Sequence, residues 1–342
     1  MIFETNEETF LTKKSFCEEK FLRKRMASIR KRHSPGRNKM LVRSLEMEQQ
    51  ENKLKQWVKS KPSLYRAAKK VWFLKPAVLK QYWVNYPWFW MGSLMRRMGI
   101  PAAKRPYEKL ESYKGKYQGK RCFVIGTGPS LRVEDLERLS GEYTFGMNSL
   151  LRLYSKTDWR PVFYFVGDFD LFAPGEAFYR KKLENVCEKQ LFLSHPIRKM
   201  QAADDAAYVP VSWLDHRVNY GSLSFRYEPD LVGYGIYDAY TIANYTIELA
   251  AYMGFTEIYL LGIDCNYSGP VKHAGETEED EKKNTKEDYQ KTEYCMMKSY
   301  EYIKSVMDSR GIHVYNASRG GKLKVFPQVD LDQVINHKDY DE

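Results

Sequence analysis

The chain has 342 residues, of which 43% are hydrophobic, and its formal net charge is +11. This length allows one large domain with an appendage, or two domains, and the hydrophobic fraction is ordinary for a globular protein. No apolar run is long enough to cross a bilayer, so we expect no transmembrane helix. The acidic N-terminus lacks the apolar core of a signal peptide, so we expect a cytoplasmic protein.

The cysteines and the charges add two constraints. The five cysteines are scattered and never form a Cys-x-x-Cys pair, which predicts reduced thiols rather than disulfides or zinc ligands. Residues 1–120 hold 29 basic and 10 acidic side chains, a net charge of +19, whereas residues 121–342 have a net charge of −8. This contrast indicates two regions with different surroundings.

Residues 1–115 are predicted to form a basic, aromatic-rich helical extension. Residues 64–101 mix Trp and Tyr with Lys and Arg, a combination that suits the headgroup region of a membrane. We therefore expect residues 20–115 to contact an anionic membrane surface. The alternatives are a solvated helical arm and aromatic rings that cap the core of the following domain. Because no RNA-reading motif is present, no specific nucleic-acid partner is expected.

From about residue 116 the pattern alternates between apolar strands and helices. Strands are predicted over residues 122–125, 143–147, 162–166, 190–193, 208–211, 257–261 and 312–315, and helices over 238–253 and 284–309. This alternation predicts an α/β, Rossmann-like domain over residues 116–330, with a mostly parallel sheet flanked by helices, and a polar tail over residues 331–342. The acidic segment 275–288 is predicted to be a mobile loop or lid.

A glycine-rich turn follows the first predicted strand. Gly126, Thr127, Gly128 and Ser130 come directly after the apolar run 122–125. Such a turn lies at the carboxyl end of a strand, where ligands bind, and its glycines let the backbone approach a phosphate. The third glycine of Gly-x-Gly-x-x-Gly and the lysine of a Walker loop are both absent. The turn thus predicts a nucleotide site of another kind, or a tight turn without a ligand.

Two further turns would lie at the same edge of a parallel sheet. Asn148 ends a predicted strand, where its amide can bind a base or a ribose, or cap a helix. Gly235 lies in a glycine turn ahead of the predicted helix 238–253 and suggests a second anion site. The alternative there is a hinge loop in which Asp238 caps the helix.

Three carboxylates also follow predicted strands. Asp168 and Asp170 form an Asp-x-Asp pair that could share a Mg²⁺ ion, although a turn or cap role is favoured for Asp170. Asp264 ends the strand 257–261, where a carboxylate can bind ribose, orient a base or hold Mg²⁺. We therefore expect Asp168 and Asp264 to be functional.

The polar loop after Asp264 holds the remaining candidates for chemistry. Tyr267 and Lys272 can bind phosphate. His273 is the best candidate for a general base because imidazole titrates near neutral pH, and His195 is the second. The alternative for His273 is an exposed loop histidine.

The order of three segments resembles a known family. These segments are Phe123-Val-Ile-Gly-Thr-Gly-Pro-Ser-Leu131, Met147-Asn148 and Ala251-Tyr-Met-Gly-Phe-Thr-Glu-Ile-Tyr-Leu-Leu-Gly-Ile-Asp264. Together they resemble the MptE-like domain family, which includes 6-hydroxymethylpterin diphosphokinase. They are also similar to bacterial lipooligosaccharide sialyltransferases. The resemblance covers roughly residues 120–325 and leaves residues 1–115 uncovered.

The resemblance to sialyltransferases implies a site for a CMP-linked sugar. It places Gly126, Gly128, Ser130 and Asn148 against the nucleotide and Gly235 near the donor phosphate. It also implies that Tyr267 stabilises the leaving phosphate.

The catalytic base departs from the sialyltransferase pattern. Those enzymes carry a histidine late in the lid, whereas this chain has Asp288 and Glu293 there, so the base would be His273 or a lid acid. In a diphosphokinase, Asp168 and Asp264 would instead hold Mg²⁺ for ATP.

The leading hypothesis is a nucleotide-sugar-dependent glycosyltransferase of surface polysaccharide or glycan biosynthesis. The acceptor would be a glycan or a lipid-linked glycan. The basic extension would hold the enzyme at the inner face of the membrane. The alternatives are a Mg²⁺-dependent pyrophosphokinase and a non-catalytic nucleotide-binding scaffold.

Overall fold

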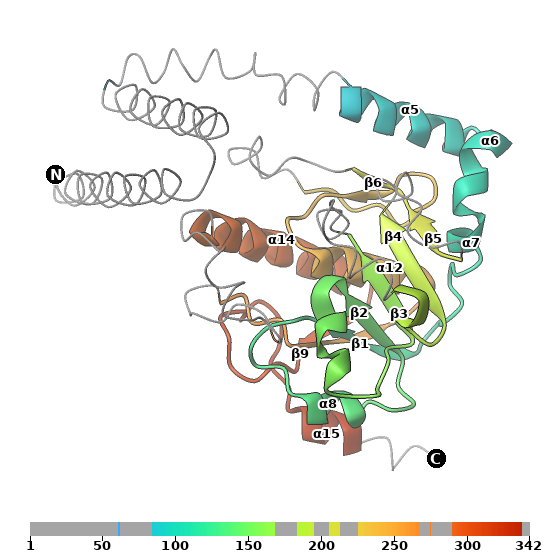
Figure 1. Cartoon of the computed structure of the whole chain (residues 1–342). Helices are drawn as coiled ribbons and strands as arrows, with labels where there is room; N and C mark the ends of the chain where they lie inside the picture. The colour runs from blue at the N-terminus through green and yellow to red at the C-terminus, as the bar shows by residue number, and fades with distance from the viewer. Residues whose placement is uncertain are drawn as a thin grey trace, which may run out of the picture. The chain divides into compact units, whose positions relative to one another are not determined.

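A computed structural model describes residues 61, 84–167, 183–194, 205–212, 225–266, 274 and 289–336. The chain divides into two compact units, Met1–Leu79 and Lys80–Glu342. The sheet and the helices that cover it belong to the second unit, which starts ahead of the predicted boundary between residues 115 and 116 (Figure 1). The predicted lid over residues 275–288 lies outside the described residues.

The second unit is built on a parallel sheet of seven strands in the order β5-β4-β3-β2-β1-β8-β9. The strands are β1 (Arg121–Ile125), β2 (Thr144–Met147), β3 (Phe163–Val166), β4 (Gln190–Ser194), β5 (Ala207–Val209), β8 (Glu257–Leu261) and β9 (His313–Asn316). Every neighbouring pair is parallel. The predicted α/β architecture is thus confirmed, and each predicted strand is found within one or two residues of its expected bounds, with one exception.

The exception is the apolar run over residues 208–211, which splits at Pro210. Residues up to Val209 belong to β5, whereas β6 (Val211–Ser212) pairs with β7 (Ile236–Tyr237) in a separate two-stranded sheet. Proline has no N–H to donate to a ladder, so it is a natural point for a strand to leave a sheet. Its carbonyl accepts a hydrogen bond from Ile236 N at 2.8 Å, which directs the chain toward β7.

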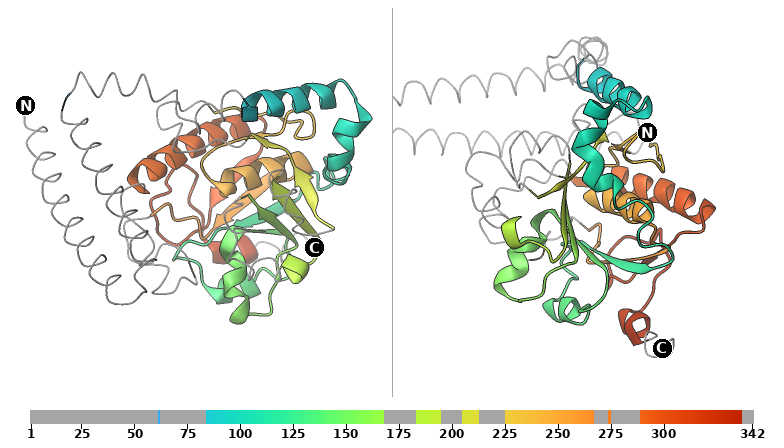
Figure 2. Two further views of the ribbon diagram at one scale, coloured as in Figure 1. Left: turned by 45° about the horizontal axis from the view of Figure 1, so that its top comes forward. Right: turned by 90° about the vertical axis from the view of Figure 1, so that its right-hand side faces the viewer.

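Both faces of the large sheet are covered (Figure 2). Side chains alternate along each strand, so Phe163 and Phe165 lie in one buried cluster while Tyr164 and Val166 lie in the other. The first cluster includes residues of α7 (Glu108–Glu111), α12 (Ile242–Met253) and α14 (Tyr289–Ser309). The second includes residues of α8 (Val133–Glu137), η3 (Asn148–Ser155) and α15 (Leu331–Asn336). Both faces are therefore buried, as the apolar strands require.

Helix α12 starts later than the sequence indicates. Thr241 is its N-cap, and the threonine hydroxyl accepts a hydrogen bond from Ala243 N at 3.3 Å. Asp238 is not the cap, because its carboxylate accepts hydrogen bonds from Tyr240 N at 2.9 Å and Tyr245 Oη at 2.5 Å. Gly254 ends the helix with a φ of 99°, so the helix ends at the predicted residue 253.

The chain enters the domain through α5 (Tyr86–Arg97), α6 (Pro101–Lys104), η2 (Arg105–Tyr107) and α7. Ser93 Oγ donates to Gly233 O at 2.9 Å, so α5 packs on the loop that precedes β7. No helix within the described ranges is both long and apolar enough to cross a membrane. At the other end of the chain, part of the predicted polar tail forms α15, whose Leu331 and Val334 are buried.

Candidate functional site

The direction of the strand order changes at β1. Strands β2 to β5 follow one another on one side of β1, whereas β8 and β9 lie on the other side. Ligands of open α/β sheets bind beside the carboxyl ends of the strands at such a switch point. The loops that leave β1 and β8, residues 126–130 and 262–266, therefore form the candidate site.

These two loops are joined by hydrogen bonds. Gly126 N donates to the last carbonyl of β8 at 2.8 Å, and Gly128 N donates to Gly262 O at 2.7 Å. Ser130 N donates to Asp264 Oδ2 at 2.8 Å, and the Ser130 hydroxyl donates to Asp264 Oδ1. The N–H groups of Gly126, Gly128 and Ser130 thus have acceptors within the protein and are not free to hold a phosphate.

Close packing of the two loops explains both glycines. A Cβ on Gly128 would lie 2.6 Å from the carboxylate of Asp264 and 2.7 Å from Gly262 O. A Cβ on Gly126 would lie 2.5 Å from Gly262 O. Real Cβ atoms do not approach so closely, so the glycines are required by the β8 loop itself.

Asp264 is buried, with 6% of its surface exposed. Its carboxylate holds Ser130, and its carbonyl accepts a hydrogen bond from Lys322 N at 2.7 Å. The neighbouring Ile263 N donates to Ser318 Oγ at 3.0 Å. The segment 318–322 therefore closes one side of the site, a contribution that sequence reasoning missed because no motif marks it beyond the Gly320-Gly321 pair.

Asn148 joins the ends of β2 and β3. It adopts a left-handed conformation with a φ of 39°. Its side-chain oxygen accepts a hydrogen bond from Gly167 N at 3.1 Å, and its carbonyl accepts one from Tyr164 Oη at 2.7 Å. Its amide group thus lies at the predicted edge of the sheet, next to the residue that precedes Asp168.

Gly235 has a different set of neighbours. Its φ is 81°, and a Cβ there would lie 2.6 Å from Pro210 O and 3.0 Å from the Phe89 ring. The structure therefore places Gly235 between α5 and the connection from β5 to β6. The hinge-like glycine turn is explained by packing on α5.

Several predicted site residues lie outside the described residues: Asp168, Asp170, His195, Tyr267, Lys272, His273 and Asp288. The residue after His273 is described, however. Ala274 N donates a hydrogen bond to Thr127 O at 2.5 Å. The chain next to the predicted base thus meets the glycine turn after β1.

Glu293 of α14 also approaches the β8 loop. Lys322 Nζ donates to its carboxylate oxygens at 2.9 and 3.2 Å, while Lys322 N donates to Asp264 O. Cys265 follows Asp264, and burial raises the pKa of its thiol to about 12. The thiol therefore stays protonated at neutral pH and is a poor nucleophile.

The described ranges contain no cluster of side chains that could bind a metal ion. No group of three or more His, Cys, Asp or Glu side chains there is arranged to hold an ion. Both carboxylate oxygens of Asp264 accept hydrogen bonds from Ser130, so in this structure the carboxylate acts as a hydrogen-bond acceptor.

The chain was compared with family models, curated proteins and solved structures, and the matches are solved structures. No family model and no curated protein matches the chain. The sialyltransferase CstII from Campylobacter jejuni is 18% identical over 62% of this chain and 85% of its own, with a TM-score of 0.39. The sialyltransferase Cst-I from Campylobacter jejuni is 19% identical over 62% and 81%, with a TM-score of 0.41.

A third solved structure is the MAf glycosyltransferase from Magnetospirillum magneticum AMB-1. It is 16% identical over 68% of this chain and 40% of its own, with a TM-score of 0.41. Likenesses of this degree decide neither the activity nor the substrate of this chain.

Proposed function

We propose that this chain is a nucleotide-sugar-dependent glycosyltransferase whose donor is a CMP-linked sugar. One observation carries the proposal: the loop after β1 meets both the loop after β8 and the residue next to His273 at the switch point of the sheet. The acceptor would be a glycan or a lipid-linked glycan of surface polysaccharide biosynthesis. The order of the motifs that resemble sialyltransferases supports the same class of reaction.

The proposed reaction is a direct displacement. His273 removes the proton from an acceptor hydroxyl, and the oxygen attacks the anomeric carbon of the donor. The bond between that carbon and the phosphate oxygen breaks, and the nucleotide leaves with the bonding electrons. Tyr267 donates a hydrogen bond to the departing phosphate. Glu293 is a weaker candidate for the base because its carboxylate already accepts two hydrogen bonds from Lys322.

The remaining residues position the nucleotide. Because their N–H groups are engaged with the β8 loop, we assign Gly126, Gly128 and Ser130 to the wall beside the nucleoside. Asn148 and Asp168 would bind the nucleoside from the next strands. Gly235 would act indirectly, through the loop ahead of α12.

A thermal-shift screen tests the choice of nucleotide. A ligand at a hundred times its Kd stabilises the folded state by about 2.7 kcal/mol, so a specific binder stands out. We expect CMP to raise the unfolding temperature equally with and without EDTA. Mg²⁺-dependent stabilisation by ATP would instead support a diphosphokinase, in which Asp168 and Asp264 face the metal.

Substitution of the proposed base tests the mechanism. His273→Ala should lower sugar transfer by about 100-fold or more, the usual contribution of a general base, and leave CMP binding unchanged. Asp288→Asn and Glu293→Gln are the matched controls and should retain transfer. Full transfer by His273→Ala would reject this base, and no transfer by the parent chain with any donor would support a non-catalytic scaffold.

A further inference from the structure

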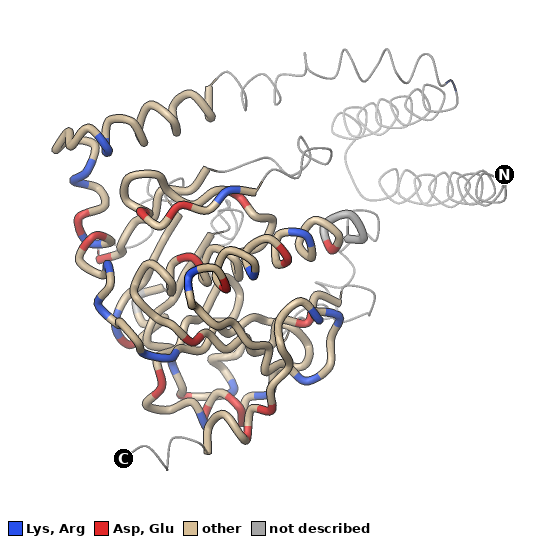
Figure 3. The backbone as a smooth tube through the Cα atoms, turned by 180° about the vertical axis from the view of Figure 1, so that it is seen from behind, with Lys and Arg blue, Asp and Glu red and all other residues tan. Residues whose placement is uncertain are grey.

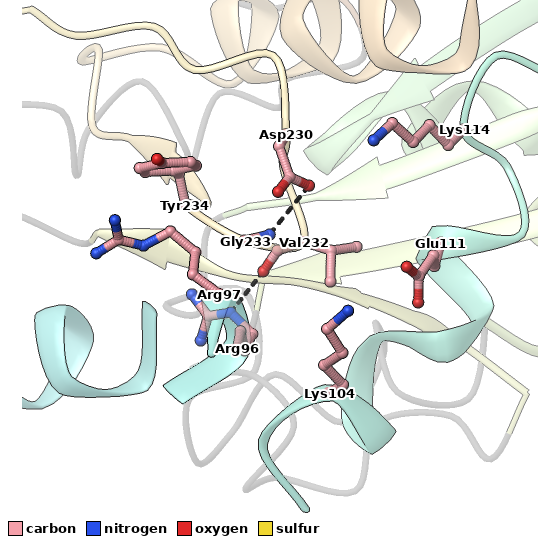
Figure 4. Close-up of a pocket in the computed structure, with 9 residues that line it drawn as sticks. All are labelled: Arg96, Arg97, Lys104, Glu111, Lys114, Asp230, Val232, Gly233 and Tyr234. Carbon is pink, nitrogen blue, oxygen red and sulfur yellow. Dashed lines mark hydrogen bonds between the residues drawn. The ribbon is translucent and has the colours of Figure 1, made fainter. Parts of the chain in front are cut away.

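A cavity of about 480 Å³ lies between α5, α6, α7 and the loop 230–234, and it belongs to none of the sites described above (Figure 4). Its lining includes four cationic and two acidic side chains, namely Arg96, Arg97, Lys104, Lys114, Glu111 and Asp230. The excess of positive charge suits an anionic ligand.

Arg96 is the most buried of the cationic side chains that line the cavity. Only 5% of its surface is exposed, and its Nε donates to Val232 O at 2.5 Å. Its guanidinium lies over the Tyr107 ring, 5.0 Å from the centroid. Its Nη2 is buried, and it has no hydrogen-bond partner in the described part of the chain. A buried cationic donor without an acceptor is costly, and the charge of the Arg96 guanidinium adds to the positive lining of the cavity.

The other charged groups leave this cationic character in place. Asp230 accepts a hydrogen bond from Gly233 N at 3.1 Å and so serves its own loop. The side chains of Lys104 and Lys114 reach into the space between α6, α7 and this loop (Figure 4). Basic residues also follow one another along the chain from α5 to β1, where residues 86–120 hold eight basic and two acidic side chains (Figure 3).

Helix α5 adds an apolar face to this charged cavity. Trp88, Met91, Leu94 and Met98 are 72%, 52%, 45% and 68% exposed, respectively. Their spacing places them on the side of the helix opposite Ser93 and Arg96, which face the domain. The apolar face and the cavity meet at the C-terminal end of α5, where Arg96 and Arg97 line the cavity and Met98 is the next residue along the chain.

We propose that the apolar face of α5 and the cationic cavity form one docking surface for an anionic phospholipid membrane. The helix lies along the interface with Trp88, Met91, Leu94 and Met98 among the acyl chains. A lipid phosphate enters the cavity and accepts hydrogen bonds from Lys104 and Lys114, beside the charge of Arg96. Exposed Trp and Met side chains beside cations fit a lipid interface, whereas a free phosphate would use the cavity and leave the apolar face in water.

This α5 docking surface is held rigidly on the domain. Ser93 Oγ bonds to Gly233 O, Arg96 Nε bonds to Val232 O, and the Phe89 ring lies 5.7 Å from the Tyr237 ring. The helix thus presents its apolar face from a fixed position. The inference does not depend on the proposed transferase activity.

Vesicle flotation of the full chain tests the cationic part of the surface. The parent should float with vesicles of equimolar phosphatidylcholine and phosphatidylglycerol and not with phosphatidylcholine alone. Lys104→Gln combined with Lys114→Gln should weaken binding roughly 30-fold, since each cation near an anionic surface contributes about 1 kcal/mol. The matched control is Lys156→Gln combined with Lys324→Gln, which removes two exposed lysines outside the cavity and should bind within about twofold of the parent.

Substitution of an exposed ring on α5 separates this surface from general attraction between charges. Trp88→Ser should weaken binding to the anionic vesicles about tenfold, whereas Tyr294→Ser, which removes a 58% exposed ring from α14, should not. Glu111→Gln should strengthen binding, because it removes a negative charge from the cavity lining.

Three results would overturn the proposal. They are equal binding to neutral and anionic vesicles, equal losses in the cavity and control lysine variants, and stabilisation by inorganic phosphate without any vesicle binding. All the substituted side chains except Lys104 are exposed, so the variants should unfold at the parent's temperature. If the double variant unfolds earlier, Lys114→Gln alone provides the same test at roughly a fivefold effect.

Discussion

Individual residues at the switch point are constrained by each other. Gly128 has no side chain where the Asp264 carboxylate lies, and that carboxylate satisfies both donors of Ser130. A residue that a motif would assign to a ligand thus also has a structural role. For any substitution here, the change in the free energy of unfolding should be measured before a change in ligand binding is interpreted.

Replacing Gly128 tests this close packing. Gly128→Ala would place a methyl group 2.6 Å from the Asp264 carboxylate, so we expect a loss of about 2–4 kcal/mol in the free energy of unfolding. Gly311→Ala is the control, because its Cβ meets open space and its φ of 68° costs roughly 1–2 kcal/mol. Urea unfolding measures both, and equal losses would contradict the packing argument.

Glu248 is a buried acid on α12. Its surface is 2% exposed, and its Oε2 has no hydrogen-bond partner among the described residues. Burial raises the pKa of this carboxyl well above its ordinary value. Between the ordinary carboxyl pKa of the unfolded chain and the raised pKa of the folded chain, the folded chain holds a proton on Glu248 that the unfolded chain has lost. The free energy of unfolding therefore falls as pH rises through that range.

Glu248→Gln should remove this pH dependence. We expect the variant to match the parent near the ordinary carboxyl pKa and to unfold at a higher temperature at neutral and alkaline pH. A gain of about 2–4 °C would correspond to roughly 1 kcal/mol for a domain of this size. Calorimetry across the pH range provides the measurement. A gain that is the same at every pH would show that Glu248 does not titrate in this way.

At the scale of elements, caps and breaks decide where helices and strands end. Thr241 starts α12 three residues after Asp238, and Pro210 divides one apolar run between two sheets. Thr241 and Pro210 are both local signals, but a prediction from the apolar pattern misses them. The periodicity of apolar residues locates the middle of an element better than its ends.

The cap of α12 gives a prediction at this scale. Thr241→Ala removes the acceptor for Ala243 N and the contact between the Thr241 hydroxyl and Tyr300 Oη at 3.3 Å. We expect a loss of about 1 kcal/mol or slightly more in the free energy of unfolding. Thr241→Ser keeps the hydroxyl and should retain most of the stability in the same denaturation experiment. A serine variant as unstable as the alanine variant would argue against a capping role.

For the whole molecule, the decisive feature is that the segment before β1 belongs to the core of the second unit. Tyr107, Leu110 and Tyr113 are buried in the cluster that α12 and α14 share. A domain boundary at residue 115 would separate all three from this core. A basic segment can thus still supply core residues.

Truncation tests this organisation. A chain that starts at Lys80 should fold and unfold at nearly the temperature of the full chain, because residues 80–342 form one compact unit. A chain that starts at residue 116 should be strongly destabilised or insoluble, since it lacks three buried side chains, each worth about 1.5–3 kcal/mol. Thermal unfolding of the two chains compares them, and equal stability would contradict the assignment of α5 to α7 to the core.

The sequence by itself determined most strands of the large sheet, their parallel arrangement, the glycine turn after β1 and the end of α12 at residue 253. These features depend on the local alternation of apolar side chains and on the conformations that glycine allows, so a short window contains the required information. The sequence also placed Asn148 and Asp264 at strand ends, and the structure puts both there.

Only the tertiary structure decided what those residues contact. The partners of Ser130 and Gly128 are 134 residues away in the chain, and the cavity joins Arg96 to the loop beside Val232, 136 residues away. Which N–H group finds which acceptor depends on the strand order, which brings β8 next to β1 and so sets the two loops against each other. No local pattern contains that order, because it results from packing both faces of the sheet at once.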